Sequence, residues 1–197
     1  MHQESIQNIM NNFMKYKKID INGKLIHVFD EVFTCAQKQK YYDFLRNSYY
    51  NATGGANVSI ETLQDVALTS VFDEEDLDNF DILNNLPEEI LDILNNFKPR
   101  RSYSLLNSYS QITHFHTDDY EHTNNLTFLY YANINWHRDW GGETMFSDDN
   151  IENIEYTSLY IPGRIIIFDS TIPHKPCPPV YGSPQFRYTF VINFKRK

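Results

Sequence analysis

The stretch Phe186-Arg187-Tyr188-Thr189-Phe190-Val191-Ile192-Asn193-Phe194 alternates in character at every step. It divides into a large apolar set (Tyr188, Phe190, Ile192, Phe194) and a set that begins with an arginine (Arg187, Thr189, Val191, Asn193). Period-two alternation of aromatic and β-branched residues predicts a strand between two packed surfaces. An arginine on an inward face needs an anion, because a buried unpaired charge is costly. The stretch therefore predicts a sheet that contains either an ion pair or an anion-binding arginine.

Four further segments of the second half have the same strand-like composition, and polar or Pro/Gly-rich turns separate them. They are residues 103–109, 126–134, 157–161 and 164–168. The first half contains a strand-like run at 24–29 and two helical patterns. One helix is expected over about 35–49, opened by the capping-box pair Thr34 and Gln37, and another after Pro87. Residues 51–57, which include Gly54-Gly55, have the composition of a flexible loop.

Helices followed by strands, without βαβ alternation, predict an α+β fold. A jelly roll (cupin-like) of antiparallel strands with N-terminal helices packed against it satisfies this order. We expect one domain over residues 1–197, with about 1–100 as a helical support region and about 101–197 as the β core.

Charge and cysteine content restrict the partners and the compartment. The formal net charge of −9 argues against a nucleic acid or an anionic membrane as the main partner. Cys35 and Cys177 lie far apart, which favours free thiols in a reducing compartment over a disulfide. The polar start, Met1 to Asn12, has no apolar signal core, and no run approaches the ~20 apolar residues of a membrane span. A cytoplasmic location is expected, and no pattern selects an oligomeric state.

His116-Thr117-Asp118 and the later His174 form a candidate metal site. Residues two apart on an extended segment project to the same side, so His116 and Asp118 can reach one ion. His174 follows the apolar strand 164–168 and a short turn, which can bring it beside them. Two histidines and one carboxylate occupy one face of Fe(II) in non-haem oxygenases, whereas a structural zinc site usually shows clustered cysteines. Alone, an H-x-D triplet arises readily by chance in a chain with 7 His and 26 acidic residues.

Several motifs of the second half, in their order, resemble the 2-oxoglutarate/Fe(II) oxygenase superfamily and its prolyl 4-hydroxylase-like branch. The resemblance runs from about Leu105 to Phe194. Besides His116-Thr117-Asp118, it includes Phe128-Leu129-Tyr130-Tyr131-Ala132-Asn133, Trp140-Gly141-Gly142-Glu143-Thr144, Pro162-Gly163-Arg164, Phe168-Asp169-Ser170, His174 and Arg187-Tyr188. The chain departs from the branch at Thr113, where a tyrosine often precedes the first metal histidine, and in the Pro-rich segment 176–184.

The resemblance implies a double-stranded β-helix core and a role for each matched residue. His116, Asp118 and His174 would bind the metal and form the catalytic centre. Arg187 would bind the distal carboxylate of 2-oxoglutarate, helped by Tyr131. Asn107 and Tyr109, on the strand before the metal motif, are further candidates for co-substrate contacts. The implied cofactors are Fe(II), 2-oxoglutarate as co-substrate, O₂ and, as an optional addition, ascorbate.

The function that this resemblance implies is hydroxylation of a substrate C–H bond with release of succinate and CO₂. Asp118 favours hydroxylation, because related halogenases lack this carboxylate. A prolyl residue in a peptide or protein is the expected substrate. Two alternatives stay open: a hydroxylase of a free amino acid or other small molecule, and a non-catalytic cupin-like module that binds a metal or ligand. The alternative for Arg187 is an ion pair with a structural Asp or Glu.

Overall fold

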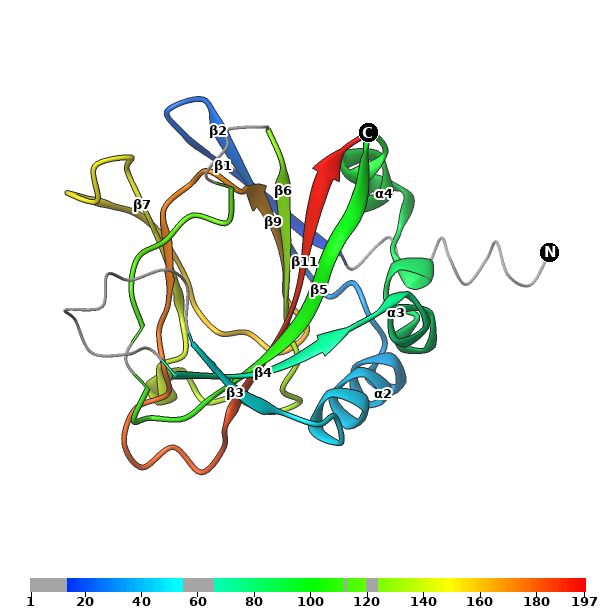
Figure 1. Cartoon of the computed structure of the whole chain (residues 1–197). Coiled ribbons are helices and arrows are strands. Elements are labelled where there is room, and N and C mark those ends of the chain that lie inside the picture. The colour runs from blue at the N-terminus through cyan, green and yellow to red at the C-terminus, as the bar shows by residue number, and fades with distance from the viewer. Residues whose placement is uncertain (1–13, 55–65, 112, 120–123) are drawn as a thin grey trace.

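Strand β11 (Arg187–Arg196), which contains the alternating stretch, lies inside a large antiparallel sheet (Figure 1). The computed structural model describes residues 14–54, 66–111, 113–119 and 124–197. Within these residues the large sheet has the strand order β1-β2-β9-β6-β11-β5-β4-β3, and a second sheet has the order β10-β7-β8. The remaining strands are β1 (Lys15–Ile21), β2 (Lys24–Asp30), β3 (Asn51–Gly54), β4 (Val66–Phe72), β5 (Phe97–Asn107), β6 (Leu126–Tyr131), β7 (Thr144–Ser147), β8 (Ile154–Ser158), β9 (Ile165–Asp169) and β10 (His174–Pro176).

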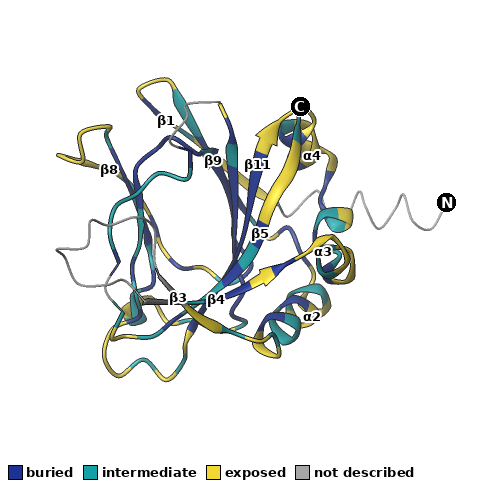
Figure 2. Ribbon diagram, in the orientation of Figure 1, coloured by how far each residue is buried: buried dark blue, intermediate teal, exposed yellow. Residues whose placement is uncertain are grey.

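Helices cover one face of the large sheet, and the small sheet lies across the other (Figure 1). The helices are α2 (Cys35–Arg46), α3 (Glu74–Phe80) and α4 (Glu88–Leu94), with 3-10 turns η1 (Leu83–Asn85) and η2 (Arg138–Trp140). The apolar set of β11 belongs to the core on the helix side, where the Phe190 ring lies 4.5 Å from that of Phe80 in α3. Figure 2 shows the central strands as buried, and their burial on both faces explains their nearly continuous apolar sequence.

The arginine-containing set of β11 faces the small sheet, as the alternation predicts. Arg187, Thr189 and Val191 line a cavity together with residues of both sheets. A second apolar cluster, which includes Phe146 of β7 and Phe168 of β9, packs beside this cavity. The two sheets therefore enclose a cavity at this position, where their facing side chains do not fill the space between them.

The expected helical support region is incomplete, because residues 15–72 also supply β1, β2, β3 and β4. β1 (KYKKIDI) is rich in lysine, which is typical of an edge strand and weakens the apolar signal of a strand. The loop expected at 51–57 is a strand over Asn51–Gly54, and residues 55–57 lie outside the described part of the chain.

Other local predictions can be compared directly with the structure. The Thr34 capping box opens α2 as expected, but the helix ends at Arg46, short of residue 49. Cys35 and Cys177 are free thiols. None of the helices in the described residues combines the length and apolar character that a bilayer span requires.

Candidate metal centre and its anion pocket

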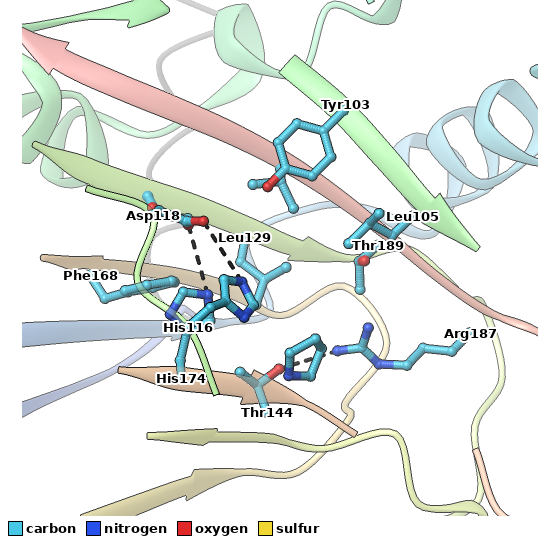
Figure 3. Close-up of a pocket in the computed structure, with 13 residues that line it drawn as sticks. Tyr103, Leu105, His116, Asp118, Leu129, Thr144, Phe168, His174, Arg187 and Thr189 are labelled. Carbon is cyan, nitrogen blue, oxygen red and sulfur yellow. Dashed lines mark hydrogen bonds and ion pairs between the residues drawn. The ribbon is translucent and has the colours of Figure 1, made fainter. Parts of the chain in front are cut away.

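The structure brings His116, Asp118 and His174 together from two distant parts of the chain (Figure 3). His174 begins β10, and His116 forms an isolated antiparallel bridge with it. The backbone N–H of each histidine donates to the carbonyl of the other, at 3.0 Å from His116 and 2.8 Å from His174. The amide of Asp118 donates to the carbonyl of Ser170 at 2.9 Å. Main-chain bonds therefore fix the segment 116–118 against the turn that precedes His174.

The potential ligand atoms of these three side chains all lie within 4.8 Å of one another. Nε2 of His116 is 3.9 Å from Asp118 Oδ1, and Nε2 of His174 is 3.8 Å from Asp118 Oδ2. Two imidazole nitrogens and a carboxylate that converge on one point fit a divalent transition metal such as Fe(II).

Both imidazole rings are held in the tautomer that a metal needs. Nδ1 of His116 lies 3.1 Å from the carbonyl oxygen of His114, and Nδ1 of His174 lies 3.1 Å from that of Ile172. Because a carbonyl can only accept, each Nδ1 carries a proton and each Nε2 presents its lone pair to the centre. Burial, together with the neighbouring His116, lowers the pKa of His174 to about 4. His174 is consequently neutral at physiological pH.

Asp118 is oriented by residues of the large sheet. Its Oδ2 accepts a 2.7 Å hydrogen bond from the Thr127 hydroxyl on β6. The same Thr127 oxygen lies 2.9 Å from the Ser170 hydroxyl and accepts from the Asn193 amide at 3.3 Å. This buried network presents the carboxylate to the two histidines. The sequence offered no signal for Thr127 beyond its place on a strand face.

Arg187 lies at the other end of the cavity and is fully buried, with 0% exposure. Its guanidinium donates to three neutral acceptors: the Gly142 carbonyl from Nε (2.7 Å), Asn107 Oδ1 from Nη1 (3.1 Å) and Thr144 Oγ1 from Nη2 (3.2 Å). Its guanidinium carbon also lies 5.5 Å and 5.4 Å from the ring centres of Tyr131 and Tyr160.

No carboxylate of the described residues forms an ion pair with Arg187. The alternative of a structural Asp or Glu partner therefore finds no support in these residues. By contrast, Arg164, the other buried arginine, binds Asp30 in bidentate fashion at 2.7 and 2.8 Å. A guanidinium has five N–H donors, and three bonds leave donors for an anion. The cavity between Arg187 and the histidines fits a ligand with a carboxylate at its far end.

The cavity has an empty volume of about 380 Å³, including space open to solvent. Its walls come from both sheets and combine the candidate metal ligands with apolar side chains (Figure 3). They are Tyr103, Leu105, His116, Asp118, Thr127, Leu129, Thr144, Phe168, His174, Pro176, Arg187, Thr189 and Val191. The Thr189 hydroxyl is buried in this wall without a hydrogen-bond partner.

The other expected site residues differ in their placement. Asn107 is buried against Arg187. Tyr131 lies behind Arg187, and its hydroxyl donates to Thr144 Oγ1 at 2.8 Å. Tyr109 is 54% exposed and packs on Tyr181, away from the cavity lining. The structure does not bring Tyr109 to the cavity, because β5 ends at Asn107 and its alternation does not continue.

Residues 104–195 match the profile of a family described as the 2OG-Fe(II) oxygenase superfamily. No curated protein sequence matches the chain. Among solved structures, the chain is similar to a Pseudomonas putida prolyl-4-hydroxylase, with 13% identity, a TM-score of 0.61 and coverage of 98% of both chains. It is also similar to a Trichoplax adhaerens prolyl hydroxylase in complex with a hypoxia-inducible-factor peptide fragment (16% identity, TM-score 0.58, 99% of this chain and 92% of that one).

A third similar structure is HygX from Streptomyces hygroscopicus with nickel and 2-oxoglutarate bound. It shares 8% identity with this chain at a TM-score of 0.63, over 87% of this chain and 83% of that one. At such identities these likenesses establish the fold. They confirm the predicted double-stranded β-helix with flanking helices.

Proposed function

We propose that this chain is a 2-oxoglutarate- and Fe(II)-dependent dioxygenase that hydroxylates a prolyl residue of a peptide or protein. The match of residues 104–195 to the profile of the 2OG-Fe(II) oxygenase superfamily supports this proposal. The proposed reaction consumes 2-oxoglutarate and O₂, converts a C–H bond of the substrate to C–OH, and releases succinate and CO₂.

One observation supports the use of 2-oxoglutarate most directly. Arg187 is a fully buried cation whose described partners are all neutral, and it lies in the same cavity as the histidine–aspartate cluster. A buried charge without a counter-ion is costly unless a ligand supplies one. A dicarboxylate whose one end binds a metal ion and whose other end binds Arg187 satisfies both features of the cavity.

In this proposal His116, Asp118 and His174 hold Fe(II), which when bound supplies the activation of O₂ at the expense of 2-oxoglutarate. Asp118 contributes the negative charge of the ligand set. The hydrogen bond from the Thr127 hydroxyl to Asp118 Oδ2 restricts rotation of the carboxylate. Arg187, positioned by Asn107, Gly142 and Thr144, binds the distal carboxylate. Apolar walls such as Leu129 and Phe168 limit water near the reacting groups.

Tyr131 contributes mainly through position in this proposal. Its hydroxyl donates to Thr144, and the same Thr144 oxygen accepts from Arg187, so Tyr131 helps to position the side chains around the guanidinium. The proposal also includes ascorbate as an optional additive and a cytoplasmic location. The free thiols of Cys35 and Cys177 are compatible with a reducing compartment.

The prolyl substrate is proposed because the sequence motifs, in their order along the chain, resemble those of the prolyl 4-hydroxylase-like branch. The similar folds of two prolyl hydroxylases are compatible with this substrate. The test incubates the protein with Fe(II), 2-oxoglutarate and O₂ and measures succinate, first alone and then with proline-containing peptides or free amino acids. Peptide-dependent succinate with a gain of one oxygen in the peptide supports the proposal. Stimulation by a free amino acid alone would transfer it to the small-molecule alternative, and no succinate under any condition would refute it.

A further inference from the structure

The pocket-side face of the large sheet continues past the candidate metal centre to an exposed arginine. Thr127, which holds Asp118, pairs across strands with Asn193, and Asn193 pairs with Arg101 of β5. Cross-strand partners share one face of a sheet. Arg101 is exposed, and its guanidinium carbon lies 4.5 Å from the ring centre of Tyr103, which lines the cavity. Arg101 therefore stands at the rim of the cavity, two strands away from the Thr127 that contacts Asp118.

Two lysines extend this face outward. A β-bulge shifts the register after Asn193, so that Lys195 pairs directly with Lys98. Because Phe194 packs into the core on the helix side, the following residue, Lys195, projects to the pocket side, and Lys98 lies beside it. Both lysines are exposed, and the outer ends of β5 and β11 are exposed side by side in Figure 2.

This arrangement is unfavourable for the chain alone. Like charges directly opposite each other destabilise an antiparallel pair. No carboxylate of the described residues forms an ion pair with Lys98, Arg101 or Lys195. The formal net charge of the whole chain is −9, so a local group of three unpaired cations is opposite in sign to the chain as a whole. Such a group next to a site attracts an anionic partner and repels a cationic one.

We propose that the rim patch, formed by Lys98, Arg101 and Lys195, binds an acidic segment of a polypeptide substrate while the residue to be oxidised enters the cavity. The proposal rests on the proposed function and specifies its substrate class. From Tyr103 to Lys98 the strand extends ~17 Å, at about 3.4 Å per residue. A free amino acid cannot reach across that length and also enter the cavity.

The size of the cavity supports the same choice. Its empty volume of about 380 Å³ is near the lower end for small-molecule sites, and the co-substrate takes part of it. Most of a polypeptide substrate must therefore lie outside, on the surface that continues from the mouth. The rim patch is the part of that surface that β5 and β11 provide.

Binding is tested without turnover, with the full chain, Fe(II) and 2-oxoglutarate under anaerobic conditions. The probe is a fluorescein-labelled peptide in which glutamates flank one central proline, and its matched control contains glutamine in their place. In fluorescence anisotropy, K98Q/R101Q/K195Q should weaken binding of the glutamate peptide about tenfold, since each exposed ion pair contributes up to ~1 kcal/mol. Binding of the glutamine peptide should stay the same.

A second triple variant controls for net charge. K40Q/R46Q/R138Q removes the same charge from exposed residues of α2 and η2 and should leave peptide affinity unchanged. Equal losses in the two variants, or no loss in the first, would overturn the proposal. Tighter binding of a single-stranded RNA than of the glutamate peptide, or equal competition by free glutamate, would also overturn it.

The two proposals fail separately. Absence of 2-oxoglutarate binding with intact, patch-dependent peptide binding would remove the proposed function and leave the rim patch as a peptide-binding surface. If the protein produces succinate but K98Q/R101Q/K195Q leaves the peptide affinity unchanged, the rim patch proposal fails and the proposed function stands. Retained 2-oxoglutarate binding in that variant shows that the cavity is intact.

Discussion

Nη1 of Arg187 donates a 3.1 Å hydrogen bond to the amide oxygen of Asn107, its direct cross-strand partner in the β11–β5 pair. An amide oxygen orients a guanidinium without neutralising it. An aspartate at the same position would satisfy the charge permanently. The amide therefore leaves the positive charge of Arg187 available to a bound carboxylate.

Replacing Asn107 by Asp should weaken 2-oxoglutarate binding by about tenfold or more, because the new carboxylate competes for the guanidinium. The folded protein should be as stable as the wild type, since a buried cation gains a partner. Isothermal titration with 2-oxoglutarate and a thermal melt measure the two effects. N107A serves as the control: it removes the hydrogen bond without adding charge and should cost less affinity. Equal losses in both variants would argue against charge competition.

Gly142→Ala should lower both stability and 2-oxoglutarate affinity. Gly142 has φ +81°, and an added Cβ would lie 2.9 Å from Cζ2 of Trp136 and 3.4 Å from Cδ of Arg187. The left-handed conformation alone costs about 1–2 kcal/mol for a non-glycine residue, and the clash adds to it. Gly182→Ala isolates the first cost, because Gly182 has φ +91° but no atom within 4 Å of an added Cβ. Chemical denaturation should show the larger loss for Gly142→Ala, and a larger loss for Gly182→Ala would contradict this explanation.

Thr127→Val should weaken metal binding about 10- to 100-fold, the usual effect of removing a group that orients a metal ligand. The Thr127 hydroxyl donates to Asp118 at 2.7 Å, and valine preserves the shape but not the donor. Thr127→Ser keeps the hydroxyl and should restore most of the affinity. Titration with Mn(II), followed by calorimetry, distinguishes the two variants. If serine and valine behave alike, Thr127 acts only through packing.

The metal-free protein should lose stability as pH falls from about 6.5 toward 4. The pKa of His174 is lowered to about 4 by burial, so the folded state binds fewer protons than the unfolded state in this range. The stabilisation is thus present above the unfolded pKa of ~6.5 and is lost as pH falls through the folded one. Thermal melts in a chelator at pH 7 and pH 5 measure it. H174Q should flatten this dependence more than H27Q, since His27 is only half-buried. An equal slope in wild type and H174Q would refute the assignment.

The elements with strong local signals could be predicted from the sequence. The alternation of residues 186–194 predicted the face that holds Arg187, and the H-x-D pair with the later His174 predicted the cluster that the structure forms. Tyr109 lies outside the cavity lining, because strand alternation does not predict where a strand ends. In the first half, the strand-like run at 24–29 corresponds to β2, whereas β3 was expected to be a loop and β4 was not predicted.

The residues that orient the site residues could not be predicted from the sequence, for a different reason. Thr127 reaches Asp118, and Gly142 reaches Arg187, across sequence separations that only the tertiary fold closes. A threonine on a strand and a Gly-Gly pair are common, so neither residue type reveals its partner. The bulge that sets Lys195 opposite Lys98 is likewise a register detail that pattern reading does not supply.

Anaerobic addition of Fe(II) and then 2-oxoglutarate to the wild type and to Arg187→Leu tests the central claim most directly. The wild type should develop the weak visible charge-transfer band of a 2-oxo acid chelated to Fe(II). Arg187→Leu should bind the metal normally but need about 100-fold more 2-oxoglutarate to give that band, because the lost charged hydrogen bonds contribute up to ~3 kcal/mol. No band in the wild type at saturating iron, or the same 2-oxoglutarate affinity in both proteins, would contradict the account.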